Sequence, residues 1–258
     1  MKIVRFTAGR RIRYGMLSSD SIQVIDGSPF RSVRPVGEHY RMSDVRLLAP
    51  CLPSKIVAVG LNYRSHAEEM GIPLPEAPLI FLKPSTAAIG LGAAIVYPST
   101  SSRVDFEGEL GVVIKKQARQ VAPDEALDYV LGYTCFNDVT ARDLQNRDGQ
   151  WTRAKGFDTF AAFGPCIETE LDPANIPVET YLNGELKQQG NTNDLIYSVA
   201  EIISFVSGVM TLLPGDVIAT GTPGGIGPMS VGDTVEIRIA PIGTLRNHVI
   251  SDGGAQVA

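Results

Sequence analysis

Residues 104–114 read VDFEGELGVVI, and this stretch decides how the rest of the chain is interpreted. Its last four residues are apolar or glycine, as in a strand that is buried on both faces. Side chains alternate across a strand, so Glu107 and Glu109 are expected on one face and Phe106 and Leu110 on the other. Two carboxylates about 7 Å apart repel each other unless a cation lies between them. The stretch therefore predicts a buried strand that carries a pair of carboxylates.

An E-x-E pair taken alone is more often part of a solvated strand face. Two features favour a site here: Gly108 lets a backbone or a ligand approach closely, and the strand continues into apolar residues. A third carboxylate, Asp138, stands where a strand predicted over 130–137 is followed by a helix, although Asp138 or Thr140 can equally be the cap of that helix. Two Glu and one Asp suit Mg²⁺, Mn²⁺ or Ca²⁺ better than zinc.

The segment NYRSHAEE at residues 62–69 holds a possible general base. On a helix, His66 and Glu69 are three positions apart and share a face. A carboxylate that holds an imidazole is the usual geometry of a general base, although such a pair is more often a surface contact. His39 lies in a polar stretch and His248 near the C-terminus, so His66 is the best candidate by location.

Two lysines and one glycine-rich turn are further candidates. Lys83 and Lys155 are isolated cations in apolar or turn-rich surroundings, where a lysine usually reaches the surface but can also hold a substrate carboxylate or a developing oxyanion. Residues 221–227 read GTPGGIG and match neither a P-loop nor the G-x-G-x-x-G pattern. They form either a tight turn or a ring of N–H groups that binds an anion together with the Thr222 hydroxyl.

Composition limits the fold and the partners. The 258 residues are 44% hydrophobic, which is enough for a sizeable core, and 26 Gly with 17 Pro imply the many turns of a β-rich chain. A net charge of −5 argues against nucleic acid as the main partner, because phosphate binding needs an excess of Lys and Arg. Apolar runs at 2–6, 12–17 and 22–25 predict a small N-terminal β-meander domain over residues 1–50, and residues 51–258 form the second domain.

The N-terminal residues, the cysteines and the hydropathy argue against a secreted, membrane-spanning or disulfide-bonded protein. We expect no secretory signal in the N-terminal residues MKIVRFTAGRRIRYG, which lack an apolar core, and no membrane partner, because the most apolar stretch, 202–213, is too short to span a bilayer. Cys51, Cys135 and Cys166 are widely spaced and odd in number, which favours three reduced thiols in a cytoplasmic protein.

The remaining elements follow from hydrophobic periodicity and turn residues. Residues 63–70 are expected to form a helix that Asn62 caps, and the proline-rich residues after it complete a mobile lid over 62–78. A second, short helix is expected over Pro123–Leu131, and a long helix over 194–213 that Thr192, Asn193 and Asp194 cap. Strands are expected at 55–60, 79–82, 104–114, 130–137, 216–220 and 233–239.

Seven segments in this order give the chain a resemblance to a known family. They are VGLNYRSHAEEM, FLKPSTA, DFEGELGVVI, GYTCFNDVTARDLQ, KGFDTF, GPC and ATGTPGGIG. Between residues 54 and 250 the chain resembles the fumarylacetoacetate hydrolase family in its short prokaryotic form. The resemblance implies a β-rich α+β fold, a mixed β-sandwich roll behind the small N-terminal β domain, and a homodimer.

The resemblance also implies roles for individual residues and a cofactor, Mg²⁺ or Mn²⁺. The roles are metal binding for Glu107, Glu109 and Asp138, catalysis for His66, Glu69 and Lys155, and substrate binding for Arg142, Gln145 and Thr222. Lys83, as an isolated cation, is a further candidate for substrate binding.

The implied substrates are 2-oxo acids with a further carbonyl, either acylpyruvates or small 2-oxo dicarboxylates. The leading hypothesis is metal-dependent hydrolysis of a C–C bond in a 2,4-dioxo acid of the acylpyruvate or fumarylpyruvate type, which releases pyruvate through an enolate. The alternatives are oxaloacetate decarboxylation and isomerisation of 2-hydroxyhepta-2,4-diene-1,7-dioate at the same site. A non-catalytic protein that binds metal or 2-oxo acids is disfavoured, because the His66/Glu69 dyad is present.

Overall fold

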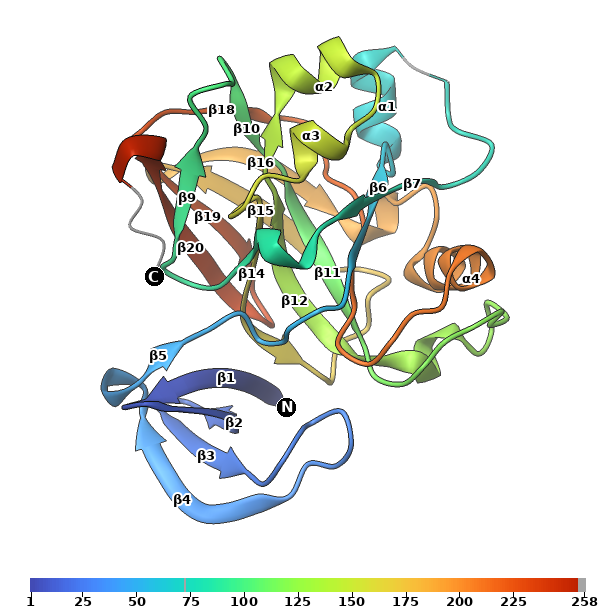
Figure 1. Cartoon of the computed structure of the whole chain (residues 1–258). Helices are drawn as coiled ribbons and strands as arrows, with labels where there is room; N and C mark the ends of the chain where they lie inside the picture. Colours follow the sequence, from blue (N-terminus) through green and yellow to red (C-terminus); the bar gives the residue numbers. More distant parts are fainter. Residues whose placement is uncertain (72, 255–258) are drawn as a thin grey trace.

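One mixed sheet of twelve strands runs through the molecule (Figure 1). The computed structural model describes residues 1–71 and 73–254, apart from the side chains of Glu69 and Met70. The strands follow the order β4-β3-β2-β1-β14-β12-β11-β17-β6-β7, with β5 beside β1 and β8 beside β14. Their bounds are β1 Lys2–Ala8, β2 Arg11–Ser18, β3 Ser21–Ile25, β4 Pro35–Arg41, β5 Arg46–Leu47, β6 Ile56–Gly60, β7 Leu79–Lys83, β8 Ala88–Ile89, β11 Gly108–Ile114, β12 Val130–Asp138, β14 Ala161–Glu168 and β17 Val217–Ala219.

A second, five-stranded sheet packs against the middle of the first. Its order is β16-β15-β19-β20-β9, with bounds β9 Ala94–Tyr97, β15 Pro177–Leu182, β16 Glu185–Asn191, β19 Thr234–Ile239 and β20 Gly243–Ser251. Leu110 and Cys135 of the large sheet share a core with Val178, Ile237 and Leu245 of the smaller one, and all five are at most 1% exposed. Two sheets that bury their facing side chains form a β-sandwich. The predicted β-rich α+β fold is confirmed.

A third sheet is small and lies beside the carboxylates. Its strands are β10 Val104–Phe106, β13 Thr140–Ala141 and β18 Gly227–Met229, in the order β13-β10-β18. The strand predicted over 104–114 is therefore two strands in different sheets, with Glu107 at the break between them. The chain changes sheets at the point where its carboxylates begin.

The N-terminal strands contain the predicted meander, β1 to β3, and two strands that were not predicted, β4 and β5. β4 was missed because most of its residues are exposed and polar, so it has no hydrophobic alternation. The meander joins the large sheet directly, since β1 pairs with β14 and Ile3 lies opposite Ile167. The domain boundary at residue 50 stays a prediction.

The helices are short and lie outside the sheets. They are α1 Arg64–Met70, α2 Arg142–Asp148, α3 Thr152–Lys155 and α4 Val199–Val209. Figure 1 shows α1, α2 and α3 together above the end of the large sheet where β6 and β7 lie, and α4 to one side. Short 3-10 turns occur at η1 Met42–Asp44, η2 Ser85–Ala87, η3 Ala126–Tyr129, η4 Thr192–Asp194 and η5 Asp252–Gly254.

The helix predicted over 194–213 is shorter, and its predicted cap is wrong. Ser198 caps α4 through a reciprocal capping box: its hydroxyl accepts from Glu201 N at 3.3 Å, and Ser198 N donates to the Glu201 carboxylate at 2.8 Å. Residues 192–194 form the separate turn η4. The periodicity was misleading because Leu195, outside the helix, is also buried.

The predicted cap of the first helix is also wrong. Asn62 is fully buried, and its side chain donates to Thr220 O at 2.8 Å and accepts from Tyr197 N at 2.9 Å. It therefore ties three chain segments together, and α1 begins after Tyr63 without a side-chain cap. The helix predicted over Pro123–Leu131 is reduced to the 3-10 turn η3.

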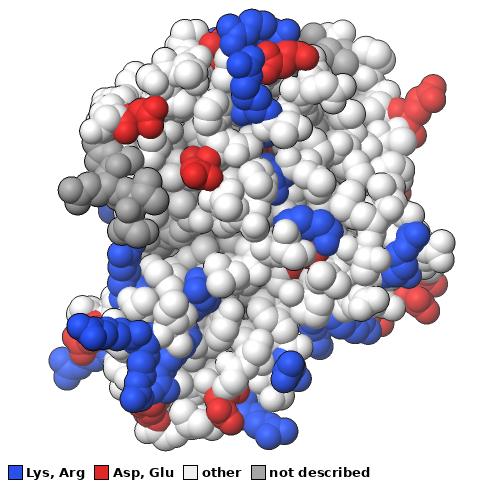
Figure 2. Space-filling view, in the orientation of Figure 1, with Lys and Arg blue, Asp and Glu red and all other residues white. Residues whose placement is uncertain are grey.

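Charge and hydropathy complete the description of the surface. None of the helices described within residues 1–71 and 73–254 is long and apolar enough to cross a bilayer. Figure 2 shows basic and acidic side chains mixed over the upper part of one face. Basic side chains predominate at the lower left, over the N-terminal strands, so the two ends of this face differ in charge.

Candidate functional site

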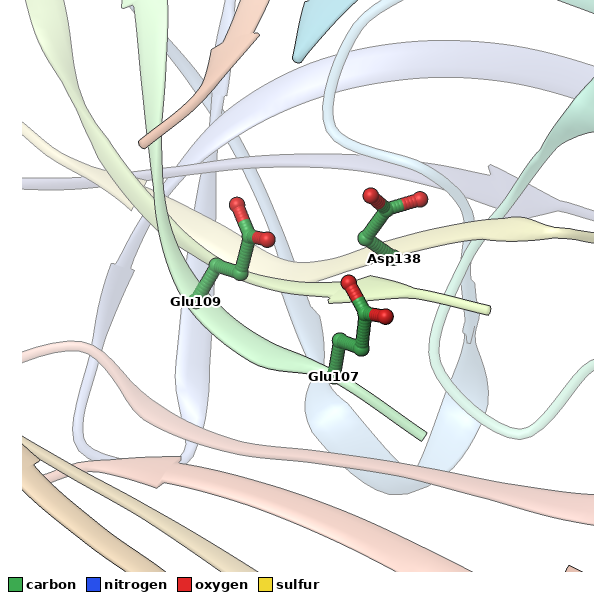
Figure 3. Close-up of side chains that lie close together, drawn as sticks. All are labelled: Glu107, Glu109 and Asp138. Carbon is green, nitrogen blue, oxygen red and sulfur yellow. The ribbon is translucent and has the colours of Figure 1, made fainter. Parts of the chain in front are cut away.

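Three carboxylates converge at one end of the large sheet (Figure 3). Glu109 comes from β11, Glu107 from the break between β10 and β11, and Asp138 from the end of the neighbouring strand β12. One carboxylate oxygen of each lies within 4.8 Å of the others, and the residues are 6%, 1% and 1% exposed in the order Glu107, Glu109, Asp138. The backbone fixes this arrangement, because Asp138 N donates to Glu107 O at 2.9 Å. The structure thus brings together the three predicted ligands.

Two buried lysines and one arginine surround the carboxylates. The Lys155 ammonium lies 2.8 Å from Glu107 Oε2 and 2.6 Å from Asp138 Oδ2. Lys83 donates to Asp138 Oδ1 and to the carbonyl of Val139, and Arg142 donates to Glu107 Oε1. Both lysines are at most 2% exposed. Buried charges are costly unless they are paired, so these groups form one interdependent network.

The network shifts the pKa values of the two glutamates in opposite directions. Burial raises the pKa of Glu109 well above its usual range, and the charges of Asp138 and Glu107 raise it further. Burial also acts on Glu107, but Lys155 and Arg142 outweigh it and lower its pKa to about 2. Glu109 is therefore the carboxylate whose charge the protein compensates least.

The two lysines differ in the same way. Burial lowers the pKa of Lys83 to about 8, although Asp138 opposes this shift. For Lys155 burial is outweighed by Asp138 and Glu107, and its pKa is raised. Lys155 is therefore held firmly as a cation between two carboxylates.

The donor set fits a divalent cation. Three buried carboxylates offer only oxygen ligands, which Mg²⁺ and Mn²⁺ prefer. Among the described residues, Glu109 has no ion-pair partner, and its carboxylate accepts a hydrogen bond from Gly221 N at 2.8 Å. A cation beside Glu109 would supply the missing charge, and it would share Glu107 and Asp138 with the Lys155 ammonium.

A cavity of about 590 Å³ opens onto the carboxylates. Its apolar wall contains Phe81 and Trp151, whose rings meet edge to face with centroids 5.1 Å apart. Other residues that line it are Val59, Gly60, Leu61, His66, Leu79, Arg103, Glu107, Glu109, Asp138, Arg142, Gln145, Asn146, Lys155, Thr222 and Ile226. Such a cavity, apolar on one side with a few convergent polar groups, is typical of a small-molecule site.

The structure places most of the predicted site residues at this cavity. His66, Lys155, Arg142, Gln145 and Thr222 line it together with the three carboxylates.

Two predicted residues are placed differently. Lys83 is fully buried behind Asp138 and is not among the lining residues, so its location suits holding Asp138 better than contact with a substrate. Glu69 lies in α1, but its side chain is outside the described part of the chain. The lid expected over 62–78 stays a prediction, and its residue 72 lies outside the described part of the chain. Within this segment, Pro75 O accepts a hydrogen bond from the Tyr197 hydroxyl at 2.6 Å.

A buried glutamine that the sequence analysis missed holds the backbone between the two glutamates. Gln188 of β16 is 1% exposed; its carbonyl oxygen accepts from Gly108 N at 2.9 Å, and its amide donates to Thr222 Oγ1 at 2.8 Å. Thr222 Oγ1 in turn donates to Gly108 O at 2.9 Å. With Gly221 N bound to Glu109, two donors that the sequence analysis offered to an anion are used within the protein.

A second missed residue is Asp105, which is fully buried two positions before Glu107. It accepts from Arg142 Nε at 2.9 Å and from Arg103 Nε at 2.8 Å. Alternation along the strand predicted over 104–114 was a usable signal, because it puts Asp105 on the same side as Glu107 and Glu109. Asp105 thereby orients Arg142, which also donates to Gln145 Oε1.

Comparison with known proteins gives two family matches. Residues 55–250 match the model described as fumarylacetoacetate (FAA) hydrolase, C-terminal, and residues 1–50 match the one described as Rv2993c-like, N-terminal. The oxaloacetate tautomerase YisK of Bacillus subtilis is 43% identical over 225 residues, which cover 81% of this chain and 75% of that protein.

Solved structures agree over almost the whole chain. The 2-hydroxyhepta-2,4-diene-1,7-dioate isomerase from Mycobacterium marinum superposes with a TM-score of 0.92 at 44% identity, covering 98% of this chain and 99% of that one. The maleylpyruvate hydrolase from Sphingobium sp. SYK-6 superposes with a TM-score of 0.82 at 31% identity, covering 97% and 100%.

Proposed function

The chain belongs to the fumarylacetoacetate hydrolase family, and from this premise we propose that it is a divalent-metal-dependent enzyme that interconverts the keto and enol forms of a small 2-oxo acid of the oxaloacetate type. The observation that carries the proposal is the convergence of Glu107, Glu109 and Asp138 beside the Lys155 ammonium in a cavity that also contains His66. Such a site can stabilise the negative charge of an enolate and also move a proton.

The three carboxylates would hold the cation, for which Mg²⁺ and Mn²⁺ are our candidates. When bound, the cation would supply the positive charge that polarises the 2-oxo group of the substrate. Lys155, fixed by Glu107 and Asp138, would donate a hydrogen bond to the oxygen on which negative charge develops. A well-placed donor of this kind contributes about 3 kcal/mol to catalysis.

Proton transfer falls to His66, the only histidine among the residues that line the described cavity. An imidazole can take a proton from C3 of the keto form and pass it to the oxygen on C2, which gives the enol, and the reverse transfer regenerates the keto form. The wall formed by Leu79, Phe81 and Trp151 would exclude bulk water from the reacting carbon. These steps need only residues whose side chains the structure describes.

C–C bond hydrolysis of a 2,4-dioxo acid, which leads the sequence analysis, is our second candidate. It is favoured by His66, which faces the same cavity and could activate a water molecule, and by the likeness to the maleylpyruvate hydrolase. It requires the enolate site and also His66 as a base that is held in orientation, and holding His66 is the role expected of Glu69. We place it second because two relatives at 43% and 44% identity are named as a tautomerase and an isomerase, both of which relocate a proton.

One assay separates the two candidates. The enol of oxaloacetate is followed by its ultraviolet absorbance, and pyruvate release from maleylpyruvate is followed with a coupled dehydrogenase, each with Mg²⁺, with Mn²⁺ and with chelator. We expect metal-dependent loss of enol absorbance that His66→Asn slows about 100-fold, the scale of general-base catalysis. Pyruvate release without tautomerisation would instead establish the hydrolase, and the absence of both would refute the proposal.

A further inference from the structure

Arg103 is a guanidinium at the cavity that the proposed reaction does not use. Its Nε donates to Asp105 Oδ1 at 2.8 Å and its Nη2 to Asp105 Oδ2 at 3.2 Å. Asp105 is fully buried, whereas half of the Arg103 side chain is exposed. A buried carboxylate that binds one edge of a guanidinium fixes its orientation. Arg103 is therefore a preorganised cation at the cavity rim.

Arg103 differs from its neighbour Arg142 in the donors that it has left. Arg142 donates hydrogen bonds from Nε to Asp105, from Nη1 to Gln145 and from Nη2 to Glu107. Only 16% of its side chain is exposed. In the described part of the chain, no hydrogen bond uses Nη1 of Arg103. Arg103 is thus the arginine of this pair that can still bind an anion.

The position of Arg103 relative to the carboxylates sets the distance of that anion. Arg142 bridges Glu107 and Asp105, and Arg103 binds Asp105. Two residues of extended chain separate Glu107 from Asp105, which is about 7 Å. Arg103 lines the same cavity as the three carboxylates, and a separation of this size is comparable to the length of a short dicarboxylic acid.

A charge count points the same way. The connected network holds four cations, Lys83, Lys155, Arg103 and Arg142, and four carboxylates, Asp105, Glu107, Glu109 and Asp138. A divalent cation would bring the network to a net charge of +2. A doubly charged substrate would neutralise that charge, whereas a monoacid would leave one positive charge unmatched.

Resting on the proposed function, we propose that Arg103 binds the distal carboxylate of the substrate and makes the site selective for 2-oxo dicarboxylates over 2-oxo monoacids. Arg103 acts on substrate choice, because Asp105 and Arg142 stand between it and Glu107 in the chain of contacts, so it does not bind the carboxylates that would hold the cation. The aromatic wall of Phe81 and Trp151 lacks a charge for this purpose, so it contributes shape only.

The test compares probes that differ only in the distal charge. Malate and its 4-methyl ester are unreactive and share the 2-hydroxy acid end, so their binding to the Mg²⁺-loaded protein can be measured by calorimetry. Oxaloacetate and its 4-methyl ester give the corresponding turnover. The variants are Arg103→Gln and Arg103→Lys, with Arg147→Gln as the control, since Arg147 is a 62% exposed arginine of α2 outside the cavity lining.

We expect the wild type and Arg147→Gln to bind malate at least tenfold more tightly than the ester. Arg103→Gln should weaken malate binding about 10- to 100-fold, the value of a charge-assisted hydrogen bond, and leave ester binding unchanged. It should raise KM for oxaloacetate with kcat nearly constant, and Arg103→Lys should recover part of the loss.

Three results are decisive. If the wild type does not distinguish malate from its ester, the assignment of Arg103 is wrong. If Arg103→Gln weakens both probes equally, Arg103 only supports Arg142 and the assignment is again wrong. If the wild type prefers malate through Arg103 but turns over neither oxaloacetate nor its ester, the proposed function fails while the dicarboxylate subsite stands.

Discussion

Replacing Gly108 by alanine tests whether close packing behind the glutamates fixes the site. A Cβ at position 108 would lie 2.0 Å from Thr180 Oγ1 and 3.0 Å from Ile237 Cδ1, and real Cβ atoms essentially never approach another atom as closely as the first distance. Thr180 and Ile237 belong to the five-stranded sheet, so the clash would push the two sheets apart. Overpacking of this kind costs about 1–3 kcal/mol.

The expected loss can be measured by thermal and urea unfolding. For a chain of this length 1 kcal/mol corresponds to roughly 2–4 °C, so Gly108→Ala should lower Tm by about 2–12 °C. It should also weaken Mg²⁺ binding measured by calorimetry, because Glu107 and Glu109 flank the displaced residue. Gly37→Ala is the matched control, since a Cβ at Gly37 of β4 meets nothing within 4 Å.

A second substitution isolates the steric cause. Thr180 Oγ1 is buried and has no hydrogen-bond partner, so removing it in Thr180→Ala sacrifices no hydrogen bond. In the double variant Gly108→Ala/Thr180→Ala the worst clash disappears, and Tm should recover by more than half of the loss. The reasoning is refuted if Gly108→Ala unfolds like the wild type, or if the double variant is as unstable as the sum of the single ones.

Three further predictions follow from charge and burial. Glu109→Gln should raise the Tm of the metal-free protein and abolish the rise in Tm that Mg²⁺ causes, because it removes the least compensated carboxylate; a lower metal-free Tm would contradict this. Burial opposes ionisation of Asp143, but hydrogen bonds from Ser101 and Ser102 outweigh it and lower the pKa of Asp143 from 3.8 to about 2. The ionised Asp143 therefore stabilises the fold fully above pH 3.8, and this stabilisation is lost as the pH falls through 2. Urea unfolding between pH 2 and 5 should show a free energy of unfolding that falls with pH in the wild type and falls less in Asp143→Asn. Burial raises the pKa of all three thiols, to about 12 for Cys166, so Ellman's reagent should label Cys51, Cys135 and Cys166 only after unfolding, and fast labelling of the native protein would disprove it.

The sequence could predict the convergence of carboxylates because the rules involved are local. Alternation along a strand puts Glu107 and Glu109 on one face, and the end of a strand is a common place for a residue such as Asp138. The seven sequence segments and their order then indicated the fumarylacetoacetate hydrolase family, which the comparisons confirm. The strands with apolar runs, β6, β7 and β12, were likewise predicted within about a residue or two.

The rest of the site depends on contacts between distant segments. Gln188 reaches Gly108 across 80 positions, and Lys83 reaches Asp138 across 55, so neither role can be inferred before the packing of the sheets is known. Asn62 resembles a helix cap in sequence, but Thr220 and Tyr197 engage its side chain instead. The ends of α4 were misjudged because periodicity reports burial, and Leu195 is buried without being helical.

The pairing of β1 with β14 gives the N-terminal fifty residues a protective role. β14 is also hydrogen-bonded to β12, the strand that ends in Asp138, so β1 covers one end of the edge that β14 would otherwise present, and β8 pairs with the other end. An uncovered edge strand invites pairing with other chains and aggregation. Removing the residues before Pro50 would therefore give a protein that aggregates rather than a smaller functional one. Fusions and circular permutations of this chain should preserve the pairing of β1 with β14 and place new termini elsewhere.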